Sequence, residues 1–120
     1  MHYSTKLLSC ATLLCIGASA LAQDTVAGKA AFASCSACHS VEGRNGVGPS
    51  LQGVVGRKAG SFAGFHYSEA MKAAATWDTA SLNAFIANPQ HAIPGNAMPF
   101  PGVPDAKVRS DIVAYLGTLK

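Results

Sequence analysis

The feature that most constrains this chain is the segment FASCSACHSVEG, residues 32–43. In it, two residues separate Cys35 from Cys38, and His39 follows directly. Two thiols at this spacing occur in disulfide exchange, in zinc binding and in the covalent attachment of a larger group. Each chemistry needs a different surrounding structure, so the residues around the segment discriminate between the three.

The N-terminal stretch, residues 1–22, has the form of a secretory signal. Lys6 precedes an apolar run over residues 7–21, and an A-x-A pattern ends at Ala22. The run is short and is broken by Ser, Thr, Cys and Gly, which favours cleavage over a membrane anchor. We expect residues 1–22 to be removed, and residues 23–120 to form one domain that is exported to the periplasm.

Removal of this leader changes the cysteine count and the charge. Cys10 and Cys15 lie within it, so the mature chain keeps only Cys35 and Cys38 and is not a multi-disulfide scaffold. The formal net charge of the whole chain is +3, and Lys6 contributes one unit of it. A balance this weak argues against nucleic-acid binding. We expect no membrane insertion after cleavage, because no later segment is apolar for long enough.

Three segments have the periodicity of helices: residues 24–34, 78–89 and 104–120. The expected N-caps are Asp24 or Thr25, Asp78 or Thr79, and Asp105, and Pro89 is expected to stop the second helix. A shorter helical turn is expected from Ser68 to Ala75. The side chains that we expect to be the apolar members of the three helices are Val26, Ala30, Phe32, Leu82, Phe85, Ile86, Val108, Ile112, Tyr115, Leu116 and Leu119.

Two long loops separate these helices. Residues 44–67 are rich in glycine, and residues 88–104 hold five of the six prolines of the chain. Few segments show the alternation of a β-strand, so the sequence predicts an all-α fold with long connections. Ordered loops of this length in a small domain need something besides each other to pack against.

The surroundings of Cys35 and Cys38 favour covalent haem attachment. A thioredoxin-like pair would follow a strand in a βαβ unit, whereas the preceding segment is helical. A structural zinc ion would need four ligands, and His66 and His91 do not form a paired-histidine motif with the two thiols. In Cys-x-x-Cys-His, two thiols add to the haem vinyl groups and the histidine is an axial iron ligand. We therefore expect one haem c, with His39 as the first axial ligand of its iron.

The second axial position has four candidate ligands in the mature chain: Met71, Met98, His66 and His91. Met98 lies in IPGNAMPF, where proline and glycine stiffen the loop that would present its thioether. Met71 lies on a short helix and is expected to fill the core. We therefore favour Met98, and a thioether ligand raises the potential of the iron.

These residues closely resemble the single-haem class I cytochromes c, in particular the cytochrome c2 and mitochondrial-like branch. The likeness covers nearly the whole mature chain in order, through GKAAFASCSACH, GVGPSLQGVVGRKAGSFAGFHYSEAM, TWDTASLNAFIANPQHAIPGNAMPF and DIVAYLGTL. It implies the small cytochrome c fold, in which three main helices, short helices and long loops surround one covalent haem.

The resemblance also assigns roles to residues outside the motif. Pro49 should accept, through its carbonyl, the second ring N–H of His39. The expected partners of the haem propionates are Arg57, Tyr67 and Trp77, which supply guanidinium, phenol and indole donors to carboxylates. Phe100 is expected to shield the haem near Met98. Gly28, Phe32 and Tyr115 match the crossing of the first and last helices.

The chain also departs from the family's pattern. Where the family commonly has an Asn, a Tyr and a Thr around the methionine sulfur, this chain has Met71, Phe85 and Asn96. We hypothesise a drier distal pocket, in which Asn96 makes any remaining polar contact to Met98, and a raised potential. The family's lysine cluster is thinned as well, with Gln90, His91 and Ala97 near the methionine loop.

The expected function is that of a periplasmic electron carrier, not an enzyme. Its expected partners are redox proteins: a bc-type complex, a terminal oxidase, or a periplasmic dehydrogenase or reductase. We expect the chain to be a monomer that forms transient complexes with them. Two alternatives stay open. The chain could be a haem subunit of a larger periplasmic complex, or a haem peroxidase-like enzyme, which would need an open axial site.

Overall fold

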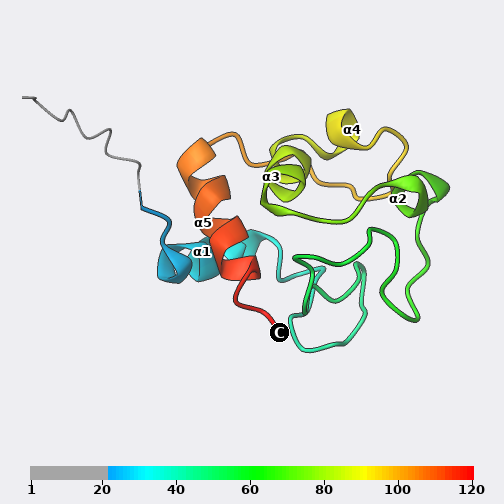
Figure 1. The fold of residues 1–120 in the computed structure, drawn as a ribbon, viewed down its shortest axis with the longest axis horizontal. Helices are drawn as coiled ribbons and strands as arrows, with labels where there is room; N and C mark the ends of the chain where they lie inside the picture. The colour runs from blue at the N-terminus through cyan, green and yellow to red at the C-terminus, as the bar shows by residue number, and fades with distance from the viewer. Residues whose placement is uncertain (1–21) are drawn as a thin grey trace, which may run out of the picture.

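The computed structural model describes residues 22–120. Residues 1–21, which are all of the expected leader except Ala22, lie outside the described residues. The helices are α1 (Thr25–Ala31), α2 (Glu69–Ala73), α3 (Thr79–Ala87), α4 (Pro89–Ala92) and α5 (Ala106–Leu116), and α1 continues into the 3₁₀ turn η1 (Phe32–Ser34). Figure 1 shows α1 and α5 crossing at one end of the molecule and α2 at the other, with long loops between them. Within the described residues there is no β-strand, only an isolated bridge between Lys58 and Thr76. The predicted all-α class is confirmed.

The helices begin at the caps that the sequence indicates. Asp24, Asp78 and Asp105 each accept backbone N–H groups of the first turn, and Asp78 also forms a capping box with Ser81. Ser68 does the same for α2. These caps fix where each helix starts, and hence which of its faces is directed inward.

The crossing of α1 and α5 depends on a glycine. A Cβ on Gly28 would lie 1.9 Å from the carbonyl oxygen of Asp111, so only glycine allows this close approach. The Phe32 and Tyr115 rings pack edge to face beside it, with centroids 5.4 Å apart. The expectation that Val26 and Ala30 belong to the inner face is wrong, because both are exposed and Val26 is 79% exposed. The inner face of α1 is instead formed by Gly28 and, one turn later, Phe32.

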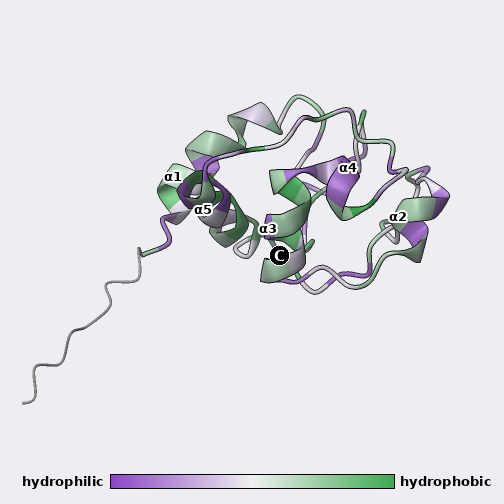
Figure 2. Ribbon diagram, turned by 90° about the horizontal axis from the view of Figure 1, so that it is seen from above, coloured by the Kyte–Doolittle hydropathy of each residue, from purple (hydrophilic) through white to green (hydrophobic). Residues whose placement is uncertain are grey.

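The core lies between the crossed helices and α3. Figure 2 shows strongly hydrophobic residues on α3, in the middle of the molecule, whereas α4 is hydrophilic. The buried hydrophobic residues are Phe32, Val54, Ala59, Trp77, Leu82, Phe85, Ile112, Val113 and Leu116. Partly buried side chains that pack against this cluster include Met71 and Met98.

The glycine-rich loop is held against the segment before α3. Gly56 donates to the Trp77 carbonyl at 2.7 Å, and the Trp77 N–H donates to the Arg57 carbonyl at 2.9 Å. The Lys58 ammonium donates to the carbonyls of Lys72, at 2.9 Å, and of Ala74 at the end of α2. These bonds place Arg57 and Trp77 side by side, although 19 positions of sequence separate them.

Candidate functional site

The two cysteines follow directly from the first helix. After η1 the chain continues in tight turns, in which Cys35 donates to the Phe32 carbonyl at 2.8 Å and His39 to the Cys35 carbonyl at 3.0 Å. Both thiols are free, with Cys35 partly buried and Cys38 exposed. Burial raises the pKa of the Cys35 thiol, and a hydrogen bond with Ser34 opposes that shift. The pair is therefore available for covalent attachment.

The imidazole of His39 is oriented by backbone groups. Its Nδ1 lies 2.7 Å from the carbonyl oxygen of Pro49, which accepts the ring N–H. This bond selects the tautomer in which Nε2 carries the lone pair that a metal needs. Burial lowers the pKa of His39, the bond to Pro49 opposes the shift, and the charge of Arg57 adds a smaller lowering. A neutral imidazole with a free Nε2 fits the role of an axial iron ligand.

Gly48 completes this arrangement and was not singled out in the sequence. A Cβ at this position would lie 2.5 Å from Cε1 and 2.7 Å from Nδ1 of His39. The backbone of Gly48 also donates to the Cys38 carbonyl at 2.8 Å. The ring of His39 therefore lies against bare backbone, and any side chain at this position would displace it. The G-x-G-P pattern after the histidine was the available signal.

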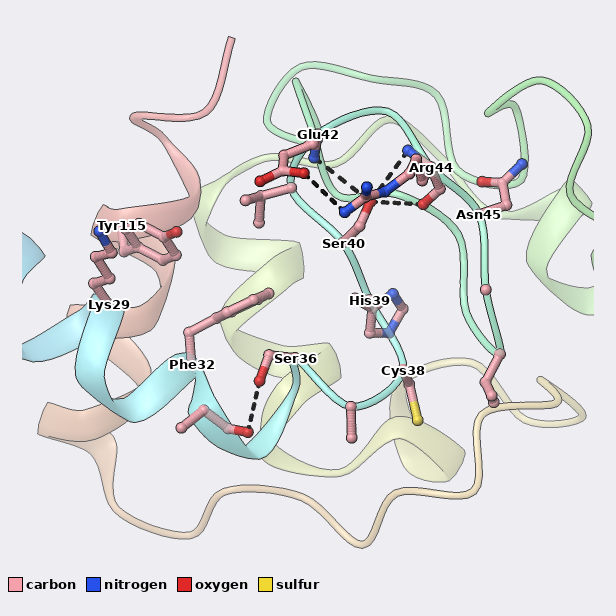
Figure 3. Close-up of a pocket in the computed structure, with 15 residues that line it drawn as sticks. Lys29, Phe32, Ser36, Cys38, His39, Ser40, Glu42, Arg44, Asn45 and Tyr115 are labelled. Atoms are coloured by element: carbon pink, nitrogen blue, oxygen red, sulfur yellow. Dashed lines mark hydrogen bonds and ion pairs between the residues drawn. The ribbon is translucent and has the colours of Figure 1, made fainter.

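A cavity of about 640 Å³ borders the motif. Figure 3 shows Phe32, Ser36, Cys38 and His39 on one side of it and Lys29 with Tyr115 on another. Neither Met98 nor the three expected propionate partners line this cavity. It therefore lies beside η1 and α5, and it is not the space that all the predicted site residues share.

The three expected propionate partners have different surroundings. The Arg57 guanidinium donates to the carbonyls of Gln52 at 2.9 Å and Ser50 at 3.0 Å, and lies 4.8 Å from the centre of the Phe62 ring. The Tyr67 hydroxyl accepts the N–H of Phe62 at 3.2 Å, which leaves its own proton to donate.

Trp77 is 9% exposed, and its ring packs on that of Phe85, with centroids 5.2 Å apart. Arg57 and Tyr67 therefore keep donors that a carboxylate could use. Burial slightly disfavours the charge of Arg57 and lowers its pKa.

Met98 and Phe100 lie half-buried in the loop between α4 and α5. The N–H of Phe100 donates to the Met98 carbonyl at 3.0 Å, and the N–H of Met98 donates to the Asn96 side chain at 2.9 Å. The candidate alternatives, His66 and His91, are exposed. No group of three or more His, Cys, Asp or Glu residues gathers in the described part of the chain, so the ligands of a closed zinc site are not assembled there.

The fold and this site define a class. The chain belongs to the cytochrome c family, whose profile matches residues 25–120. It is therefore an electron carrier with one covalently bound haem c, and not an enzyme. The resemblance drawn from the sequence is confirmed.

Individual relatives are similar over most of the chain. Cytochrome c2 iso-2 of Magnetospirillum fulvum is 50% identical over 91 residues, which are 74% of this chain and 95% of that protein. Cytochrome c2 of Rhodoblastus acidophilus is 47% identical over 102 residues, 82% of this chain and 95% of that protein. The solved structure of cytochrome cH from Methylobacterium extorquens is 50% identical, with a TM-score of 0.76, and covers 79% of this chain and 98% of its own.

Proposed function

We propose that this chain is a periplasmic one-electron shuttle whose haem iron has His39 and Met98 as axial ligands. The observation that carries the proposal is the bond from His39 Nδ1 to Pro49, which leaves Nε2 free beside the Cys35 and Cys38 thiols. The haem supplies an iron that alternates between the ferrous and ferric states. With both axial positions filled by side chains, the iron has no open site for a substrate.

The residues of this chain divide the remaining tasks. Cys35 and Cys38 tether the group, and Pro49 holds the tautomer of His39. Arg57, Tyr67 and Trp77 are proposed to donate to the propionates, whose charge would otherwise be costly inside the protein. Phe100 is proposed to shield the haem from water near Met98. Such screening keeps the iron's surroundings of low polarity.

The proposed location and processing depend on residues 1–22. Within residues 22–120, no helix combines the length and the apolar character that are needed to cross a membrane. We propose cleavage after Ala22 and release into the periplasm, where the partners are redox proteins such as a bc-type complex, an oxidase or a dehydrogenase. The likeness to cytochrome c2 proteins supports a redox shuttle of this kind.

The proposal is tested on protein taken from the periplasmic fraction of an expressing cell. Intact mass should equal residues 23–120 plus one haem, and a redox titration should be reversible with one electron. The reduced protein should bind carbon monoxide only slowly and weakly. Ready binding of carbon monoxide would contradict a filled sixth position and would favour the enzyme alternative.

A further inference from the structure

The loop that carries Met98 is fastened by one buried side chain, Asn96. This residue is 6% exposed, and each polar atom of its amide is used. Its Nδ2 donates to the carbonyls of Pro89 and Ile93, both at 2.8 Å, and its Oδ1 accepts the N–H of Met98 at 2.9 Å. A single amide therefore joins both ends of α4 to the backbone of the proposed iron ligand.

A second side chain reinforces this connection from the surface. The exposed Gln90, on α4, donates from Nε2 to the backbone carbonyl of Asn96 at 2.9 Å. The backbone N–H of Asn96 donates to the Ile93 carbonyl at 3.1 Å. Five hydrogen bonds thus converge on Asn96. We call Asn96 and Gln90 the amide clamp.

The other side of the loop is also fixed. Val103 donates to the Ile86 carbonyl at 2.7 Å. Gly102 has φ of 113°, and a Cβ there would lie 2.2 Å from the Ala87 carbonyl oxygen, so the chain passes directly over the end of α3. Only the five residues 97–101 lie between the two anchors, and two of them are proline. Met98 lies in this span, two residues after Asn96 of the amide clamp.

The side chain of Met98 is partly buried and packs against the core cluster. The nearby polar side chain of Asn96 makes its three hydrogen bonds to backbone groups. Asn96 does make a polar contact to Met98, as expected from the sequence. The contact is to the backbone N–H of Met98. In the described residues, Met98 therefore forms its hydrogen bonds through its main chain, and its side chain is held by packing against the core.

We propose that the amide clamp of Asn96 and Gln90 positions Met98 for the iron, so that its strength determines how readily another ligand replaces the thioether. The inference rests on the proposed His39 and Met98 ligation. A loop held in its bound conformation loses little freedom on coordination, and releasing it makes coordination less favourable. The clamp residues are positioning residues, because neither touches the iron.

The test is a titration of the oxidised holoprotein with imidazole. Binding is measured as the loss of the absorption band at the red edge of the visible spectrum, which reports methionine–iron ligation. Asn96→Ala should bind imidazole about tenfold or more tightly than wild type, because it loses the three hydrogen bonds of the amide side chain. Asn96→Ser, which can still accept the Met98 N–H, should fall between the two. Gln90→Ala should bind about threefold more tightly.

The matched control is Gln52→Ala, since Gln52 Nε2 donates to the Lys120 carbonyl at 2.8 Å, the same kind of bond in another part of the protein. It should lower the Tm about as much as Gln90→Ala without changing imidazole affinity. Gln90 is exposed, so its variant keeps the test decisive even if Asn96→Ala does not fold. Unchanged imidazole affinity in Gln90→Ala and in any folded Asn96 variant would overturn the clamp. A missing band in wild type would overturn the proposed ligation as well.

Discussion

At the scale of single residues, the proposed axial histidine is held by backbone and not by other side chains. Pro49 fixes the tautomer of His39, and Gly48 leaves room for its ring. Neither contact requires a charged or reactive group. This makes the site sensitive to substitutions that appear conservative.

Gly48→Ala should therefore displace the imidazole. The added Cβ would lie 2.5 Å from Cε1 of His39, and overpacking of this kind typically costs about 1–3 kcal/mol. We expect a lower Tm and a lower yield of haem-loaded protein, measured by calorimetry and by absorbance. Gly46→Ala is the control, because its Cβ would meet only the Cys38 carbonyl at 3.6 Å. Equal effects of the two substitutions would contradict the role given to Gly48.

The hypothesis of a drier pocket around Met98 gives a second prediction at this scale. Met71 is half-buried and packs against the core, and Phe85 is 6% exposed. Met71→Asn should lower the midpoint potential by about 20–60 mV, the one-electron equivalent of one net hydrogen bond, because a polar amide stabilises the more charged ferric state. Met71→Leu should leave the potential nearly unchanged. No change in the potential with the asparagine, or a rise, would refute the hypothesis of a dry pocket.

At the scale of elements, caps were easier to predict than helix faces or ends. Asp24, Asp78 and Asp105 are local signals, and each caps the expected helix. Pro89 was expected only as a stop. α3 does end before it, at Ala87, but Pro89 is also the first residue of α4, where its missing N–H costs nothing.

Other misses arise from tertiary contacts that no local pattern contains. The inner face of α1 is set by the approach of Gly28 to α5, so Val26 lies outward despite its apolar side chain. Asn96 was recognised as a departure from the family's pattern, yet its partners on α4 follow only from the folding of the loop. The propionate roles of Arg57, Tyr67 and Trp77 came from resemblance, and they remain predictions.

The α1–α5 crossing makes stability depend on pH. Asp111 on α5 accepts from the Lys107 ammonium at 2.5 Å and from the Asp24 N–H at 2.9 Å, with its side chain 8% exposed. The hydrogen bond from Lys107 first, and then that from Asp24, lower the pKa of this carboxyl. The resulting stability is present above the pKa of the unfolded carboxyl, about 3.9, and is lost as pH falls through the lower folded pKa.

Asp111→Asn should accordingly lower the Tm by several degrees at neutral pH, and the difference from wild type should shrink as the pH falls below about 4. Thermal unfolding followed by circular dichroism measures both curves. Glu69→Gln is the control, because its ion pair with Lys72 is exposed and should contribute little. A gap between Asp111→Asn and wild type that stayed constant with pH would show that the charge of Asp111 is unimportant.

At the scale of the whole molecule, the net charge is small, and within residues 22–120 three basic side chains are in ion pairs. The net charge is +3, including Lys6, and Arg44, Lys72 and Lys107 each pair with an acid. Near the methionine loop, Gln90, His91 and Ala97 are exposed and are not lysines. Long-range attraction to an acidic partner should therefore be small.

Electron transfer to a redox partner should then depend little on salt. Between about 0.01 M and 1 M ionic strength the Debye length falls from about 30 Å to about 3 Å, and we expect the second-order rate to fall by less than about threefold. Stopped-flow mixing of the reduced protein with an oxidised partner measures this rate. A steep fall, of tenfold or more, would contradict weak steering and would indicate a charged patch on the docking surface.

The central claim is that one haem c is held by Cys35 and Cys38, with His39 and Met98 on its iron. The absorption spectrum of the oxidised holoprotein tests it most directly, with Met98→Ala and His91→Ala measured beside wild type. The account predicts the weak red-edge band of methionine–iron ligation in wild type and His91→Ala, and its loss in Met98→Ala. A wild-type spectrum without that band, or a band that survives in Met98→Ala, would contradict it.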